Sequence, residues 1–178
     1  MIILIGPSAS GKTEVVKYLV NNFGYTKLVT NTTREKRIGV IDGKDYNFIT
    51  KEEFLSKLNN DEFFEYVEYN SNFYGTLKKD ITKEKVVILE PKGFQAYKHS
   101  KFKGIISFYL DTRDEIRYER MLKRGDKKER IKERIESDGI VFNRESIDGV
   151  DYILNSNDLT VPELAIEINA LYEKELKK

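Results

Sequence analysis

Residues 1–20 read MIILIGPSASGKTEVVKYLV: an apolar run, a glycine-rich turn and the start of an amphipathic pattern. Met1 to Ile5 is short, apolar and ended by Gly-Pro, which favours a buried parallel strand. Beyond the turn, apolar residues recur at helical spacing as far as Phe23, and Gly24 supplies a stop. The stretch therefore predicts a strand, a loop and a helix in that order.

The turn itself, GPSASGKT at residues 6–13, fits the pattern G-x-x-x-x-G-K-[ST]. Such a loop at the start of a helix points successive N–H groups at an anion, and the helix dipole favours negative charge there. A lysine in this position reaches the outer phosphates, and the following hydroxyl is a ligand for Mg²⁺. The alternative is a chance match in a flexible loop, but the place after a buried strand favours a nucleoside triphosphate site. Its expected residues are Gly6, Ser8, Ala9, Ser10, Gly11, Lys12 and Thr13.

Length and composition narrow the class of protein. The 178 residues suit one domain, and 31 basic against 30 acidic residues give no overall field that would attract nucleic acid or an anionic membrane. The absence of cysteine excludes disulfides, thiolate metal sites and cysteine nucleophiles. Apolar runs are far shorter than the roughly 20 residues that span a bilayer, and no basic stretch precedes the first one. We expect a cytoplasmic protein, a monomer or homodimer, without nucleic-acid or membrane partners.

Strand and helix patterns alternate along most of the chain. Strands are expected at 86–89, 104–110 and 152–154, and helices at 113–123 and 161–176. A short segment beginning at Pro91 is expected to do no more than separate two of the strands. Alternating elements of this kind predict a layered α/β fold with a mainly parallel sheet.

Two stretches interrupt this alternation. Residues 31–80 hold a small helix pattern at 53–58 and an aromatic run at 63–74, which indicates an inserted subdomain. Residues 125–139 are polar and predict a mobile helical lid. The prediction is a single domain, with a core of about 1–30, 81–124 and 140–178.

Several ordered motifs resemble those of guanylate kinases, a family of P-loop nucleoside monophosphate kinases. They are TNTTREKRIG at 30–39, DGKDYNF at 42–48, EFFEY at 62–66 and NFYGT at 72–76. The resemblance covers nearly the whole chain. It implies a three-layer P-loop fold with a nucleotide-binding insert and a helical lid. It also implies an enzyme of purine nucleotide metabolism that uses ATP and Mg²⁺ to phosphorylate GMP, and dGMP as well.

The resemblance further implies a GMP site formed by Thr30, Arg34, Arg37, Tyr46, Glu65, Tyr74, Gly75 and Thr76. Arginine forks match phosphate, and tyrosine hydroxyls add neutral donors. The carboxylate of Glu65 would accept from guanine N1–H and the exocyclic amine, whereas adenine presents an acceptor there. Taken singly, these residues could also be surface charges and packing aromatics.

On the ATP side, residues 120–125 (RMLKRG) resemble the entrance to the family's lid. The resemblance implies that Arg124 and Arg134 act on the transferring phosphoryl group, together with Lys12 and Arg34. It places Arg120 and Asn155 in the ATP site. Because the lid is one residue shorter than the commonest spacing, Arg130 competes with Arg134 for its role. A solvated charged helix is the alternative for this segment.

The chain departs from the family pattern at residues 89–92, LEPK. Glu90 can replace the first family acid, beside the metal that Thr13 would hold, but Lys92 reverses the charge of the second. Either the contact to guanine is made elsewhere, or recognition is looser. The lone His99 lies in a polar segment that favours a surface position over a catalytic one.

Phosphoryl transfer requires alignment and charge neutralisation, and no dedicated base. Three alternatives to GMP phosphorylation stay open from the sequence. The chain could phosphorylate another nucleoside monophosphate or a ribose bisphosphate, it could be a non-catalytic guanylate-kinase-like binding module, or it could be a P-loop hydrolase. Lys12 and the lid arginines argue against the binding module, and the phosphate-gripping insert argues against the hydrolase.

Overall fold

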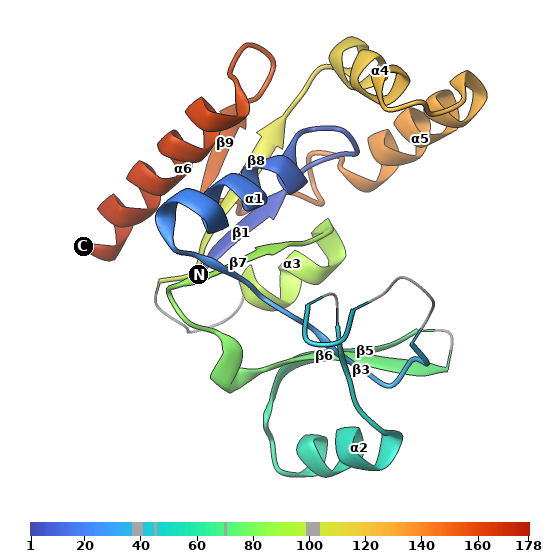
Figure 1. Ribbon diagram of the computed structural model, residues 1–178, viewed down its shortest axis with the longest axis vertical. Helices are drawn as coiled ribbons and strands as arrows, with labels where there is room; N and C mark the ends of the chain where they lie inside the picture. Colours follow the sequence, from blue (N-terminus) through green and yellow to red (C-terminus); the bar gives the residue numbers. More distant parts are fainter. Residues whose placement is uncertain (37–40, 45, 70, 99–103) are drawn as a thin grey trace. The chain divides into compact units, whose positions relative to one another are not determined.

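The computed structural model describes residues 1–36, 41–44, 46–69, 71–98 and 104–178. They form two compact units, Met1–Tyr25 with Val86–Lys178 and Thr26–Lys85 (Figure 1). The second unit is one continuous stretch of chain, and the Thr26 amide donates a 2.9 Å hydrogen bond to the Glu84 carbonyl. Each unit has its own hydrophobic cluster.

Strand β1 (Ile2–Ile5) lies inside a sheet with the order β2-β7-β1-β8-β9. The other strands are β2 (Thr26–Lys27), β7 (Lys85–Ile88), β8 (Ile106–Asp111) and β9 (Tyr152–Asn155). β7 and β8 run parallel to β1, and β9 runs parallel to β8. Every residue of β1 is buried, as expected for a central parallel strand read as an unbroken apolar run. The predicted mainly parallel sheet is confirmed.

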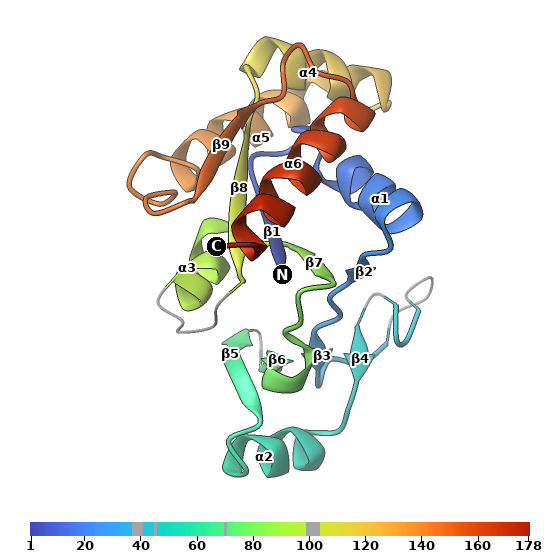
Figure 2. The same ribbon diagram turned by 90° about the vertical axis from the view of Figure 1, so that its left-hand side faces the viewer.

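Helices α1 (Lys12–Phe23) and α6 (Val161–Leu176) lie side by side on one face of this sheet (Figures 1 and 2). Ile2 and Leu4 of β1 join the core beneath them. A capping box fixes the start of α6, because Thr160 and the residue at the third helical position exchange hydrogen bonds. The observed bounds of α6 equal the predicted ones.

Helix α3 (Pro91–Lys98) contacts β1, whose Ile3 and Ile5 point away from α1 and α6 because side chains alternate across a strand. Phe94 and Tyr97 are its buried aromatic residues. No helix was predicted for the segment that begins at Pro91, yet it is helical, and proline at the first helical position is pre-organised for a helix start. Helices on both faces confirm the layered α/β fold (Figure 2).

Helices α4 (Asp114–Lys123) and α5 (Lys128–Val141) follow β8. Gly125 lies in the turn between them with φ 91°. The predicted lid stretch is helical and continues past its expected end at residue 139. Within α5 the buried residues are Ile131 and Asp138, one apolar and one charged. None of the helices in the described part of the chain is long and apolar enough to cross a membrane.

The second unit is a small sheet with one helix. Its strands have the order β4-β3-β6-β5: β3 (Asn31–Thr32), β4 (Asn47–Phe48), β5 (Phe63–Tyr69) and β6 (Asn72–Leu77), followed by the short 3-10 helix η1 (Lys78–Asp80). β6 runs antiparallel to both β3 and β5. Phe54 of α2 (Lys51–Asn59) is fully buried and stacks on Phe63 at 4.2 Å between ring centroids. The predicted helix and aromatic run therefore form a core of their own.

Candidate functional site

The glycine-rich turn connects β1 to α1 in a conformation that its residues allow. Gly11 precedes the helix with φ 98°, a region that disfavours side chains, and Ala9 also has a positive φ of 62°. At Gly6, an added Cβ would lie 2.9 Å from the Leu110 carbonyl of β8. The first glycine is therefore required for close packing and Gly11 for the backbone turn.

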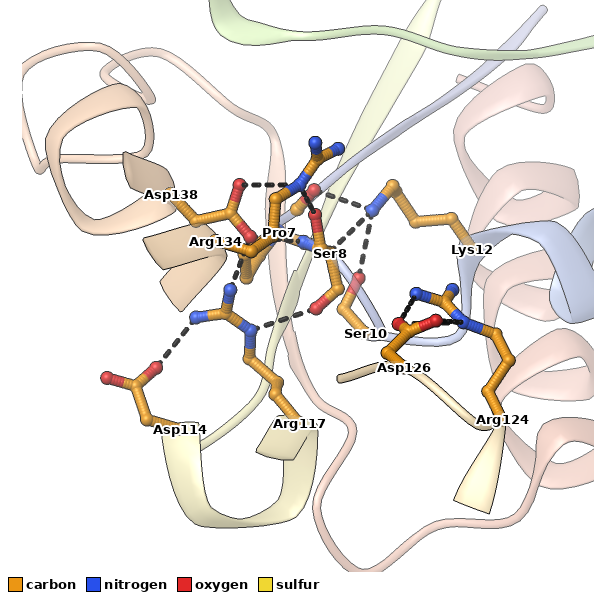
Figure 3. A network of polar contacts seen from close by, with 11 residues as sticks. Pro7, Ser8, Ser10, Lys12, Asp114, Arg117, Arg124, Asp126, Arg134 and Asp138 are labelled. Atoms are coloured by element: carbon orange, nitrogen blue, oxygen red, sulfur yellow. Dashed lines mark hydrogen bonds and ion pairs between the residues drawn. The ribbon is translucent and has the colours of Figure 1, made fainter. Parts of the chain in front are cut away.

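The ammonium group of Lys12 lies inside this loop (Figure 3). Its Nζ donates to the Gly6 carbonyl at 2.6 Å, the Pro7 carbonyl at 2.7 Å and Ser10 Oγ at 3.2 Å. Burial lowers the pKa of Lys12 to about 8, opposed chiefly by the negative charge of Asp138. Lys12 thus rests on the loop's own acceptors, and its burial favours the neutral form more than in an exposed lysine.

An ion pair behind the loop was missed by sequence analysis. Arg117 of α4 and Asp138 of α5 are 3% and 7% exposed and form an ion pair. The Ser8 amide donates to Asp138 Oδ2 at 2.8 Å, and Arg117 Nε donates to the Ser8 carbonyl at 2.9 Å (Figure 3). Both residues stand among many charges in helices that look solvated, so no local signal marked them.

The three predicted lid arginines differ from one another in their contacts. Arg134 Nε donates to Ser8 Oγ at 2.7 Å, which brings it onto the loop. Arg124 forms an ion pair with Asp126, which raises the pKa of Arg124 through their hydrogen bond. Arg130 lines the same cavity as Arg134. Of the two competing residues, Arg134 is the one in contact with the loop.

Two cavities meet at the loop. The larger, about 1010 Å³, is strongly basic, with Lys12, Arg124, Arg130 and Arg134 in its wall. The smaller, about 480 Å³, combines the loop with apolar side chains: it is lined by residues 9–14, Arg120, Arg124, Leu159, Thr160, Val161 and Leu164. Thr13 lines both. A polyanion suits the first cavity and a flat, partly apolar group suits the second.

Arg120 donates a hydrogen bond to the backbone of the loop. Its guanidinium donates to the Ala9 carbonyl at 3.2 Å and to the Ser156 carbonyl at 2.9 Å. Asn155, at the end of β9, accepts instead from the Asn157 amide at 2.9 Å and is not in either cavity wall. The neighbouring Ser156 is fully buried and donates to the Ser10 carbonyl at 3.3 Å. Sequence analysis did not identify Ser156.

Glu90 and Lys92 follow the carboxyl end of β7. Both are exposed, and both line a cavity of about 230 Å³ with Gln95 and Ser146. The charge of Glu90 is among the influences that raise the pKa of Lys12. A carboxylate and a threonine hydroxyl are the oxygen ligands that Mg²⁺ prefers, so Glu90 and Thr13 fit that ion chemically.

In the second unit, Arg34 lies over an aromatic ring. Its guanidinium carbon is 5.0 Å from the centroid of Tyr46, whose ring meets that of Tyr74 edge-on at 6.1 Å. In the described part of the chain Arg34 Nε is buried and has no hydrogen-bond partner. Three of the predicted phosphate-binding residues therefore gather here. The fourth, Arg37, lies outside the described residues, as does His99.

Glu65 and Thr76 are opposite each other on β5 and β6. Burial raises the pKa of Glu65, and hydrogen bonds with Thr76 oppose this. Gly75 is required beside them because an added Cβ would lie 2.8 Å from the Phe63 ring. Thr30 enters through its backbone, whose carbonyl accepts from the Asn47 amide at 2.9 Å. A half-buried carboxylate thus stands on the sheet whose strand β3 ends two residues before Arg34.

A parallel strand, an anion-binding loop and a helix, followed by arginines that converge on the loop, define a P-loop nucleotide-binding protein. The family model described as guanylate kinase matches residues 1–167, so the chain belongs to the guanylate kinase family.

Curated relatives agree with the family model. The guanylate kinase of Clostridium tetani is 39% identical over 131 residues, 70% of this chain and 63% of its own length. The aligned part is therefore less than two thirds of that relative. The guanylate kinase of Helicobacter pylori strain 26695 is 32% identical over 168 residues, 89% of this chain and 80% of its own. The crystal structure of guanylate kinase from Anaplasma phagocytophilum has a TM-score of 0.65 at 22% identity and covers 100% of this chain and 86% of that one, which supports the fold.

Proposed function

We propose that this chain transfers the γ-phosphoryl group of ATP to GMP, and also to dGMP, and that it releases ADP with the nucleoside diphosphate. The family and the names of the relatives support this reaction. The observation that carries it is the buried Nε of Arg34, which has no hydrogen-bond partner among the residues that the structure describes.

A buried N–H without an acceptor is unfavourable by about 1–3 kcal/mol, and more when it belongs to a charged group. Arg34 therefore has a donor in place for an anion that the described residues do not supply. Phosphate matches the planar guanidinium fork, and the hydroxyls of Tyr46 and Tyr74 would add donors to the same group. With Arg37, these residues would hold the GMP phosphate.

Guanine would be selected by Glu65. Guanine N1–H and its exocyclic amine are both donors, so an ionised carboxylate accepts from them, whereas it repels the acceptor at adenine N1. The hydroxyl of Thr76 and the loop around Thr30 would complete this contact, with Gly75 leaving room for close approach. The partial burial of Glu65 strengthens the discrimination because a desolvated charge interacts more strongly.

ATP would occupy the first unit, with its phosphates in the basic cavity and its adenine in the smaller one. The amides of Ala9, Ser10 and Gly11 would cradle the phosphates beside Gly6 and Ser8. Arg120 would flank the base, and Asn155 would approach it only after exchanging its bond with Asn157.

In the proposed reaction an oxygen of the GMP phosphate attacks the γ-phosphorus, and the bond to the bridging oxygen breaks so that ADP leaves. The nucleophile is anionic near neutral pH, so no side chain has to remove a proton. Lys12, Arg124 and Arg134 would neutralise charge on the transferred group, and Arg34 would hold the acceptor. Thr13 and Glu90 would hold Mg²⁺, which supplies further charge neutralisation when bound.

The finer assignments follow from this chemistry. We propose a cytoplasmic monomer or homodimer with small-molecule nucleotide partners and no nucleic-acid or membrane partner. The proposed organisation is one guanylate-kinase-like domain in which residues 31–80 serve the monophosphate and residues 125–139 act as a lid.

The test is an acceptor panel. The protein is incubated with ATP, Mg²⁺ and either GMP, dGMP, AMP, CMP, UMP or ribose 1,5-bisphosphate, and ADP and the phosphorylated product are measured together. We expect ADP formation that depends on GMP or dGMP and is lost in Lys12→Met. Transfer to another acceptor alone, ADP without any acceptor, or no reaction at all would each overturn the proposal.

A further inference from the structure

Ser8 is held from outside the phosphate loop on both sides of its backbone. Its amide donates to the Asp138 carboxylate of α5 at 2.8 Å, and its carbonyl accepts from Arg117 of α4 at 2.9 Å. Its hydroxyl accepts from Arg134 at 2.7 Å. A residue in the middle of the anion-binding loop is thus fastened by two helices that follow much later in the sequence (Figure 3).

Arg117 is almost fully buried, yet its guanidinium is well supplied with acceptors. Nε donates to the Ser8 carbonyl, Nη1 donates to Asp114 Oδ1 at 2.7 Å, and Nη2 forms the ion pair with Asp138. Arg120, one turn further along α4, donates to the next loop carbonyl, that of Ala9. One face of α4 therefore binds the consecutive carbonyls of Ser8 and Ala9. The N–H that follows each carbonyl points the opposite way in a trans peptide, which favours the Ala9 and Ser10 amides on the other side.

Asp138 connects this face to the lid helix. Its Oδ2 accepts from both Ser8 and Arg117, and its Oδ1 lies 3.9 Å from Nε of Arg134, one helical turn earlier in α5. The side chain of Arg134 is 65% exposed, so it points into the open cavity from a helix whose buried anchor is Asp138. The rotation of α5 that satisfies Asp138 is the one that presents Arg134 to the loop.

We propose that Arg117 and Asp138 are positioning residues for phosphoryl transfer: together they fix the Ser8 peptide and the rotation of α5, and so hold Arg134 at the outer edge of the phosphate site. This inference rests on the proposed function. Neither residue touches a nucleotide in it, and each acts through Ser8 or Arg134.

Fold stability alone does not account for charges at these positions. A buried ion pair is often replaceable by apolar residues of similar volume with little loss of stability, whereas removing one partner leaves an unpaired charge. What an apolar pair does not provide is the directional grip on one peptide N–H and one carbonyl. The two roles are separable by experiment for this reason.

The decisive variant is Arg117→Met combined with Asp138→Leu, which removes the grip without leaving a lone buried charge. Its matched control is Lys98→Met combined with Asp148→Leu, because that ion pair at 2.9 Å joins two segments of the same unit away from the loop. Steady-state kinetics with ATP and GMP, thermal unfolding and hydrogen exchange of the 128–141 amides are measured for both.

For the double variant Arg117→Met with Asp138→Leu, called the loop variant because it frees the Ser8 peptide, we expect kcat to fall about 100-fold. This is the effect of displacing a catalytic group by roughly 1 Å. The KM for GMP should stay within about 2-fold of the native value. The backbone amides of α5 should exchange hydrogen about 10-fold faster, since the hydrogen bonds of Asp138 no longer hold the helix. The control should keep native values. Arg134→Gln should lower kcat in the native chain but add little in the loop variant, because residues that act as a unit are not additive.

A loop variant that folds and keeps kcat within about 2-fold of native would overturn the inference, as would an unchanged exchange rate in α5. Should this variant fail to fold, Asp138→Ala decides, since it removes the acceptor of the Ser8 amide while Arg117 keeps the Ser8 carbonyl and Asp114 as acceptors; native kcat there would overturn the inference too. Absence of GMP-dependent turnover in the native protein would instead be a failure of the proposed function, and the exchange rates would then decide on the anchoring of α5 alone.

Discussion

The phosphate loop and the Arg34 site treat their cations in opposite ways. Lys12 gives its hydrogen bonds to the loop's own carbonyls and hydroxyl. Arg34, by contrast, keeps Nε buried and unpartnered among the described residues. A ligand at the loop must replace contacts that exist already, whereas an anion at Arg34 supplies one that is missing. The hydrogen bonds of Lys12 therefore hold the shape of the loop before a ligand binds, whereas Arg34 gains a hydrogen bond when an anion binds.

The largest effect is expected from breaking the loop side with Lys12→Met. Removing the cation that meets the phosphates should lower kcat/KM about 100- to 1000-fold, the range for losing one preorganised group at a transition state. A coupled assay of ADP release measures it. Lys17→Met is the control, since Lys17 lies on the same helix and forms an exposed ion pair with Glu14. Turnover within a few-fold of native would contradict the role of Lys12.

Arg34→Met breaks the other side. Hydrogen bonds to charged groups contribute about 1.5–3 kcal/mol, so the KM for GMP should rise about 10- to 100-fold. Thermal stability should not fall, because the change removes the buried Nε of Arg34, which has no hydrogen-bond partner among the described residues. Lys51→Met is the control: that ammonium also lies over an aromatic ring, 5.6 Å from the centroid of Phe73, in the same unit. A native KM for GMP in Arg34→Met would count against phosphate binding there.

Glu65→Gln should weaken GMP binding about 10-fold, the scale of one charged hydrogen bond. Because burial raises the pKa of Glu65, GMP affinity should fall as the pH drops through that raised pKa, and the variant should lack this dependence. The free energy of unfolding depends on pH in the opposite direction. A carboxyl group whose pKa is raised in the folded state stabilises the fold at pH values below its pKa in the unfolded chain, and this stabilisation is lost as the pH rises through its pKa in the folded state. Calorimetric titration of GMP across pH checks the first statement, and equal pH profiles for both proteins would refute it.

The smallest effect concerns the charge on Lys12. With its pKa lowered to about 8, the unliganded chain should lose affinity for ATP as the pH rises above that value, by a few-fold per unit. Stability should rise with pH above about 8, because the unfolded chain then binds more protons. Titrations of an ATP analogue between pH 7 and 9 measure the first effect. Lys12→Met should show a flat profile, and a steep one there would assign the titration to another group.

The sequence specified elements whose signals are local. Helix α6 was predicted with its observed bounds from its repeating apolar residues, and the structure adds the Thr160 cap at its start. The loop was predicted from its glycines and its place after a strand. Helix α3 was missed because Gly93 lowers helix propensity in a short segment, although Pro91 marks a start.

The site divides in the same way. Arg134 was predicted to be a lid arginine that acts on the phosphoryl group, and the structure shows it in contact with the loop, whereas Arg117, Asp138 and Ser156 were not foreseen. Each of these three acts through a contact between elements distant in sequence. In a chain with 34% charged residues, composition cannot say which arginine is buried. Only the packing of α4 against α5 decides it.

The hydrogen bond between the Thr26 amide and the Glu84 carbonyl bears on how such an enzyme diversifies. Residues 26–85 leave and rejoin the rest of the chain at one place, so their connection behaves as a closed loop whose ends already meet. An exchange of this whole segment would leave the strand, turn and helix around Lys12 with the same neighbours in the chain. In the proposed function, exchanging this segment would replace the acceptor site and leave the ATP site unaltered.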